Sequence, residues 1–126
     1  MSTQISKTIR GAYPSLPYEE IANTILGKKY DVSLVFIGAK RARSLNETYR
    51  KKTYVPNVLS FPLDSHTGEI FITPEVTQKE AVKFNLSPKG YIGYLFIHAL
   101  LHLKGHHHGA TMEKAEKRYV SLFGLS

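Results

Sequence analysis

The sequence contains no cysteine, has fewer acidic than basic side chains, and has no long apolar run. The missing cysteines exclude disulfide bonds and thiolate metal sites, and nothing in the composition indicates an oxidising compartment. No segment reaches the roughly 18 uninterrupted apolar residues of a membrane-spanning helix. The first residues, MSTQISKTIRGAYP, lack the apolar stretch of a signal peptide. We therefore expect a cytoplasmic protein that does not enter a membrane.

The chain has 126 residues, of which 42% are hydrophobic, and this suffices for one buried core. A single domain over residues 1–126 is expected. The formal net charge of +7 favours acidic partners, and nucleic acid is the commonest large one. Six Lys or Arg side chains fall between Lys40 and Lys52, where Glu47 is the one acid. This basic stretch is either an ordinary solvated helix face or a contact for RNA.

Hydrophobic periodicity predicts strands in the first sixty per cent of the chain and helices at its end. We therefore expect an α+β (mixed α/β) fold, with a small mixed sheet of about four strands packed with about five helices. In the helix predicted at 39–51, the side chains of Ala42, Leu45 and Tyr49 should face inward and the basic ones outward. Strands are expected at residues 3–9, 31–38, 58–63 and 69–73, and helices at 16–30, 39–51, 74–85, 87–103 and 111–124.

Five of the six histidines fall within the segment HALLHLKGHHH, residues 98 to 108. His98 and His102 are four residues apart in a predicted helix, so both rings project from one face, about 5–6 Å apart at Cβ. They continue a stripe that begins with Tyr91 and Leu95 and is otherwise apolar. A polar group on such a face costs roughly 1–3 kcal/mol unless it is satisfied. A bound metal ion would satisfy both rings at once.

Gly105 can adopt a positive φ, which ends a helix and turns the chain sharply. The turn can bring His108 back toward the other two rings. This arrangement predicts one Zn²⁺ per chain, bound by His98, His102 and His108, with each nitrogen about 2.0–2.1 Å from the ion. Three protein ligands leave one coordination position open, where zinc activates water for hydrolysis. A metal-dependent hydrolase is therefore the favoured class.

The segment contains two further histidines and matches one other motif. We expect His106 at the surface, and the residues leave the role of His107 open. The ligand spacing around Gly105 also matches the metzincin protease pattern H-E-x-x-H-x-x-G-x-x-H. That pattern needs a glutamate as general base where this chain has Ala99, and only eighteen residues follow His108. A zinc protease is therefore a minor alternative.

Three blocks of the sequence match, in order and separation, the signatures of a known family. HALLHLKGHHH is similar to H-G-x-L-H-L-x-G-Y-D-H, and LNETYRKKTYVPNVLSFP, from Leu45 to Pro62, is similar to L-N-x-x-Y-R … T-D-V-L-S-F-P. GEIFI, from Gly68 to Ile72, is similar to G-D-I-x-I. These blocks resemble the YbeY family of metal-binding, single-strand endoribonucleases implicated in ribosomal RNA maturation and ribosome quality control. The likeness runs from about Tyr30 onward.

The resemblance implies a mixed α/β fold with a small sheet and zinc held by the three histidines. It also implies single-stranded RNA, such as a ribosomal RNA precursor, as substrate, and a ribosomal subunit or ribosomal proteins as partners. Arg50, the arginine of the Y-R pair, is implied to face the metal site and to stabilise the charge of the transition state. Without the resemblance, Arg50 would be an ordinary exposed basic residue. The side chains expected to hold the RNA backbone are Lys40, Arg41, Arg43, Lys51 and Lys52.

The chain departs from the family pattern around the expected site. Ala99 replaces the glycine after the first ligand, Pro56 and Asn57 stand where Thr-Asp is usual, and His106 and His107 stand where Tyr-Asp is usual. Two aspartates of the family pattern are therefore missing here. The sequence leaves open which groups support the metal ligands and which group acts as general base. The alternative function is therefore a non-catalytic, metal-stabilised ribosome-assembly factor that binds RNA and cuts nothing.

Overall fold

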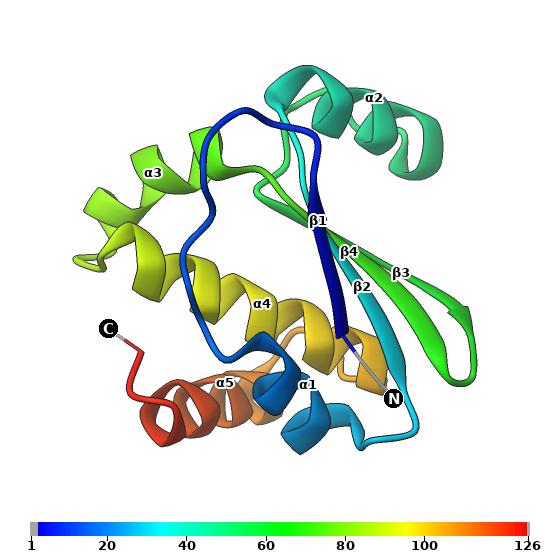
Figure 1. Cartoon of the computed structure of the whole chain (residues 1–126), viewed down its shortest axis with the longest axis vertical. Helices are drawn as coiled ribbons and strands as arrows, with labels where there is room; N and C mark the ends of the chain where they lie inside the picture. Colours follow the sequence, from blue (N-terminus) through cyan, green and yellow to red (C-terminus); the bar gives the residue numbers. More distant parts are fainter. Residues whose placement is uncertain (1–2, 126) are drawn as a thin grey trace.

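The computed structural model describes residues 3–125 and has the expected α+β class (Figure 1). In this part of the chain four strands form one mixed sheet, and five helices pack around it. The strands are β1 (Thr3–Lys7), β2 (Asp31–Phe36), β3 (Val58–Asp64) and β4 (Thr67–Ile72). The helices are α1 (Tyr18–Leu26), α2 (Ala39–Arg50), α3 (Pro74–Lys83), α4 (Pro88–Lys104) and α5 (Ala110–Leu122).

The strands lie in the order β1-β2-β4-β3, so β1 and β3 are the two edges. β1 and β4 run parallel to β2, whereas β3 forms the predicted antiparallel hairpin with β4. Pro62 fits in β3 because an edge strand does not need every backbone N–H for pairing. The ladder also shifts register between Pro62 and Asp64. At this edge β3 packs against α4.

The main core lies between one face of the sheet and helices α1, α4 and α5. In Figure 1 helix α4, drawn in yellow, crosses the molecule between the sheet and the helices α1 and α5. Buried side chains occur all around α4, because the sheet, α1, α3 and α5 all contact it. The predicted N-cap is confirmed: the Ser87 hydroxyl oxygen accepts from the Gly90 N–H at 3.0 Å. No helix within residues 3–125 is long and apolar enough to cross a bilayer.

Helix α2 covers part of the opposite face of the sheet and forms a smaller core there. Ala42 is buried in this core and Leu45 is half-buried, as predicted. The prediction for Tyr49 is wrong: its side chain is 67% exposed, and its ring meets the edge of Phe61 at 5.5 Å between centroids. The inward position in the last turns of α2 belongs instead to the fully buried Asn46.

Asn46 fixes the chain reversal that follows α2. Its side-chain amide donates to the Tyr54 carbonyl oxygen at 3.0 Å. The backbone carbonyl oxygen of Asn46 accepts from the backbone N–H of Lys51 and, at 3.2 Å, from that of Lys52. Lys51 takes the left-handed conformation (φ 56°, ψ 39°), which costs an L-residue roughly 1–2 kcal/mol. These contacts hold the backbone on both sides of Arg50.

Gly105 ends α4 in the left-handed conformation (φ 108°, ψ 4°), as predicted. The Gly105 N–H donates to the His102 carbonyl oxygen at 3.0 Å. The His106 N–H donates to the Leu101 carbonyl oxygen at 2.9 Å. These are the hydrogen bonds that satisfy the last carbonyl groups of a helix when a glycine follows it. The chain therefore turns back over the last turn of α4 and carries His108 toward it.

Candidate metal centre

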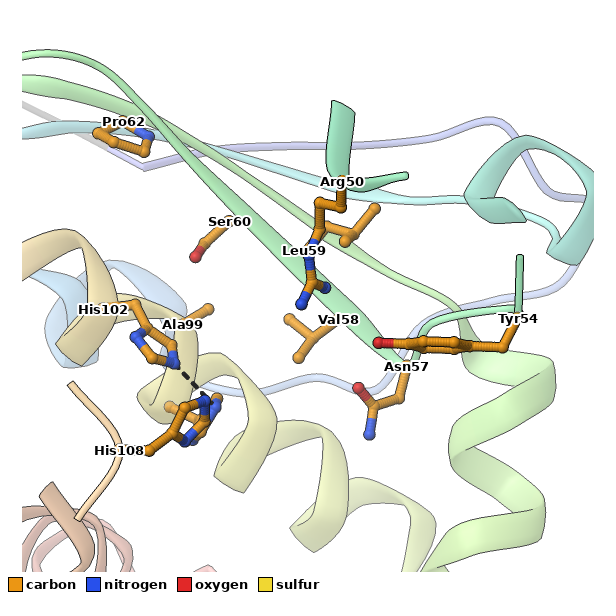
Figure 2. Close-up of a pocket in the computed structure, with 11 residues that line it drawn as sticks. Arg50, Tyr54, Asn57, Val58, Leu59, Ser60, Pro62, Ala99, His102 and His108 are labelled. Atoms are coloured by element: carbon orange, nitrogen blue, oxygen red, sulfur yellow. Dashed lines mark hydrogen bonds between the residues drawn. The ribbon is translucent and has the colours of Figure 1, made fainter. Parts of the chain in front are cut away.

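The rings of His98, His102 and His108 meet at the C-terminal end of α4. One ligand nitrogen from each lies within 4.8 Å of the other two. The Nε2 atoms of His98 and His102 are 3.2 Å apart, and the three pairs of ring centroids are separated by 4.6, 4.7 and 5.2 Å. Figure 2 shows His102 and His108 facing each other at one side of a cleft. The helix and the Gly105 turn together produce the convergence that the spacing predicts.

Hydrogen bonds at Nδ1 orient two of these rings. Nδ1 of His98 is hydrogen-bonded to the Glu116 carboxylate, and Nδ1 of His102 to the His106 carbonyl oxygen at 3.1 Å. Carboxylate and carbonyl oxygens accept, so each Nδ1 is placed to donate, and in a neutral ring this leaves the Nε2 lone pair for a metal ion. The two Nε2 atoms are 3.2 Å apart, close enough to share a hydrogen bond or to bind one cation together.

The donor set fits a zinc ion. With zinc–nitrogen bonds of about 2.0–2.1 Å, the nitrogens of a tetrahedral site lie about 3.3 Å apart. This is close to the 3.2 Å between the Nε2 atoms of His98 and His102. Burial lowers the pKa of His102, and the neighbouring His98 lowers it further. A lower pKa keeps the ring in the neutral form that binds a metal.

The other two histidines of the segment lie outside the group of ligand nitrogens found among the described residues. His106 is half-buried, and its contribution to the site is its carbonyl oxygen, which orients His102. His107 is exposed. His108 is also exposed, so one of the three candidate ligands is open to solvent while the other two are half-buried.

The three histidines form one wall of a cleft of about 420 Å³ between α4 and the edge strand β3. Val58 and Ser60 of β3 and Tyr54 of the preceding loop line the other side. Arg50 also lines this cleft, and Figure 2 shows its guanidinium reaching from the end of α2 into the space between β3 and α4. The structure therefore brings Arg50 and the histidines to one cavity.

The other five basic residues expected to contact RNA do not line this cleft in the part of the chain described. Arg43 forms an ion pair with Glu47 at 3.1 Å, in which both side chains are about half exposed. The guanidinium of Arg41 lies 6.0 Å from the centre of the Phe71 ring. All five are exposed and belong to α2 or the residues just after it: Lys40, Arg41, Arg43, Lys51 and Lys52.

Glu116 on α5 is the residue of this site that the sequence analysis missed. Its side chain is 5% exposed, and one carboxylate oxygen accepts from the Tyr94 hydroxyl at 3.5 Å while the other is bound to His98. A carboxylate on the far nitrogen of a ligating histidine is a common support of zinc sites. The available signal was its spacing, because Met112, Glu116 and Tyr119 follow one inward stripe of α5.

Asn57, which departs from the family pattern, belongs to a hydrogen-bond network beside the cleft. Its side-chain amide donates to Glu80 at 2.9 Å, and the Tyr91 hydroxyl donates to the same carboxylate oxygen at 2.9 Å. Burial and the hydrogen bond to Glu80 raise the pKa of Tyr91 to about 12, so the phenol keeps its proton. An aspartate at position 57 would place a second carboxylate against Glu80. An asparagine at position 57 can instead donate to Glu80, so the two side chains are compatible in this chain.

Replacing Glu116 with glutamine is expected to weaken metal binding about 10- to 100-fold, because a neutral amide no longer increases the basicity of His98. Titration with zinc against a competing chelator measures the affinity. Glu19→Gln, which removes the same charge from an exposed position on α1, is the matched control and should bind as the unmodified protein does. Equal affinity in Glu116→Gln and Glu19→Gln would show that the carboxylate does not support the metal site.

The mixed sheet, the five helices and the histidine group define a small α+β protein with a cleft suited to a metal ion. A family model described as "Endoribonuclease YbeY" matches residues 2–122. The chain belongs to the YbeY family.

Several curated proteins named "Endoribonuclease YbeY" are similar to this chain. That of Mesoplasma florum is 34% identical over 103 residues, which cover 73% of this chain and 60% of the relative. That of Alkaliphilus metalliredigens is 36% identical over 100 residues, covering 71% and 64%, so this chain spans less than two thirds of either relative. That of Campylobacter jejuni is 36% identical over 115 residues, covering 85% and 84%.

A solved structure supports the fold. The solution structure of a Thermotoga maritima protein matches with a TM-score of 0.67 and 24% sequence identity. The match covers 94% of this chain and 87% of that one. Nearly all of the described fold therefore has a counterpart determined by experiment.

Proposed function

We propose that the protein is a zinc-dependent endoribonuclease that cuts single-stranded RNA in ribosomal RNA maturation and ribosome quality control. The observation that carries this proposal is the meeting of three imidazoles and one arginine in a single cleft. Membership of the YbeY family supports the reaction type, because the similar proteins are named endoribonucleases. A ribosomal RNA precursor as substrate and a ribosomal subunit as partner follow from the family resemblance.

His98, His102 and His108 would hold one zinc ion per chain, since imidazole nitrogen is a preferred ligand of this metal. When bound, zinc supplies Lewis acidity toward a phosphate oxygen and lowers the pKa of water to about 7. Glu116 and the carbonyl oxygen of His106 orient two of the rings through Nδ1. Two of the three ligand nitrogens are thus held in place by hydrogen bonds within the chain.

Arg50 would bind the phosphate that is cut. A guanidinium is charged at every relevant pH and offers paired N–H donors that match two phosphate oxygens. Arg50 lines the cleft together with the histidines, so a phosphate in the cleft would contact both. Negative charge grows on the phosphate oxygens as the nucleophile attacks, and a fixed cation beside them lowers the barrier.

The exposed basic residues of α2 would hold the RNA strand on either side of this phosphate. Arg50 ends α2, and Lys51 and Lys52 follow it directly. Lys40, Arg41 and Arg43 project from the same helix into solvent. Side chains that contact the backbone of a flexible strand need exposure rather than a cavity, and the net charge of +7 attracts RNA from solution.

We expect the purified, zinc-loaded protein to cut a single-stranded oligoribonucleotide and to leave a duplex of the same sequence intact. A chelator should abolish cleavage, and zinc added back should restore it, because the proposed reaction depends on the bound ion. Denaturing gels follow the reaction, and mass spectrometry of the product ends identifies the nucleophile. A terminal 2′,3′-cyclic phosphate would mean attack by the ribose hydroxyl. RNA binding without any cleavage would instead favour the non-catalytic assembly factor.

A further inference from the structure

A second hollow of about 380 Å³ adjoins the metal cleft on the side of α3 and α4. Asn57, Val58 and His98 line both cavities, so a ligand can extend from one into the other. Within residues 3–125, the rest of the second lining is aromatic or aliphatic and includes no lysine or arginine. The two cavities therefore differ in chemistry: the first carries the groups for a phosphate, and the second suits an apolar, flat ligand.

Four rings lie in a row along the second hollow and end at a candidate metal ligand. Phe84 stacks on Tyr91 with 5.5 Å between centroids and 20° between planes, and Tyr91 stacks on Tyr94 with 6.0 Å and 15°. The Tyr94 ring lies 6.2 Å from that of His98. Tyr91 is buried, whereas Phe84, at the outer end of the row, is 61% exposed. An exposed ring beside a cavity is a surface that a flat ligand can cover.

Hydrogen bonds at the phenol oxygens keep this row in place. The Tyr91 hydroxyl donates to Glu80, and the Tyr94 hydroxyl donates to Glu116. Tyr91 is stacked between its two neighbours, so the exposed ring of Phe84 is the main aromatic surface that the hollow presents to a ligand. At the border of the two cavities, Glu80 holds the amide nitrogen of Asn57, and Figure 2 shows the amide oxygen of Asn57 turned toward the metal cleft.

We propose that this hollow, the base groove (Phe84, Leu86, Tyr91, Tyr94), holds one nucleobase of the RNA strand next to the phosphate that Arg50 binds. The proposal rests on the nuclease function proposed above. A nucleobase fits because every base has a flat π surface that stacks on an aromatic ring, whereas a phosphate would find no cation there. The Asn57 amide oxygen would accept a hydrogen bond from the ribose or base beside the groove.

The base groove gives a physical reason for acting on single strands. A base within a duplex is paired and stacked on its neighbours, so its face cannot turn into a groove on the protein. A base in a single strand is free to do so. The strand would then be held by one base in the groove and by its phosphates on the basic residues of α2.

The test measures binding of an eight-nucleotide oligoadenylate, and of the same strand with an abasic site at each position in turn, by fluorescence anisotropy. A chelator, which should abolish cleavage, is present throughout, and gels run alongside confirm that the strand stays intact. We expect Phe84→Ala and Phe84→Leu to weaken binding of the complete strand about fivefold or more, the lower end of the effect of losing one stacking ring. Both variants should also lose the sensitivity to one abasic position that the unmodified protein shows. Val82→Ala, at a 77% exposed position of α3 outside the groove, is the matched control.

Each other outcome overturns the proposal. If Phe84→Ala binds every strand as the unmodified protein does, no base occupies the groove, and the nuclease proposal stands because it depends on the histidines and Arg50. If RNA binding is weakened in Phe84→Ala but not in Phe84→Leu, the groove requires an apolar side chain and not an aromatic ring. A protein partner, and not a stacked base, would then be its occupant. If no protein binds RNA, both proposals fail together.

Discussion

His98→Ala and His102→Ala proteins are expected to be purified with almost no bound metal and to cut single-stranded RNA at less than a hundredth of the normal rate. The two Nε2 atoms lie 3.2 Å apart, and losing either leaves too few ligands to hold the ion. Loss of a supporting residue alone costs about 10- to 100-fold, so loss of a ligand should exceed that range. Elemental analysis gives the metal content, and a denaturing gel gives the cleavage rate.

The matched control for these variants is His107→Ala. His107 belongs to the same segment, but its side chain is exposed and lies outside the group of converging nitrogens. Its metal content and cleavage rate should stay at the normal level. Full metal content in both His98→Ala and His102→Ala would show that these rings do not form the metal site.

Arg50→Ala is expected to lower the rate of cleavage about 10²- to 10³-fold, the usual effect of removing one group that stabilises transition-state charge. The metal content should not change, and the affinity for single-stranded RNA should fall much less than the rate, because other basic side chains also contact phosphates. Arg50→Lys should recover only a small part of the rate, because an ammonium group lacks the planar pair of donors. Single-turnover cleavage and anisotropy measure the two quantities separately.

Arg10→Ala is the control for the loss of one positive charge, because Arg10 is exposed in the segment that follows β1. It should cut RNA at close to the normal rate. The assigned role of Arg50 is wrong if Arg50→Ala cuts as fast as Arg10→Ala. It is also wrong if Arg50→Ala loses its metal, since its effect would then act through the metal site.

The sequence predicted those parts of the fold and site that depend on neighbouring residues. Periodicity located the strands and helices, although the helix predicted at 16–30 is shorter in the structure (Tyr18–Leu26). The four-residue spacing of His98 and His102 and the glycine at 105 were enough to predict that the rings converge. All of these features are set within one element or one turn.

The features that the sequence did not predict depend on contacts between elements. Glu116 reaches His98 only because α5 packs against α4, and no local pattern encodes that pairing. The prediction that Tyr49 faces inward was wrong, since its side chain is exposed. Helical spacing tells which face of the helix a residue lies on, but not whether another element covers that face at that point. The row of rings beginning at Phe84 likewise requires the packing of α3 on α4.

The hydrogen bond between Asn57 and Glu80 makes two positions 23 residues apart depend on each other. An amide at position 57 can donate to a carboxylate at position 80, whereas an aspartate there would need a donor such as glutamine or lysine opposite it. Each partner thus restricts which side chain fits at the other position. A substitution at one position alone would break this hydrogen bond, even where the new residue is the one that a relative carries.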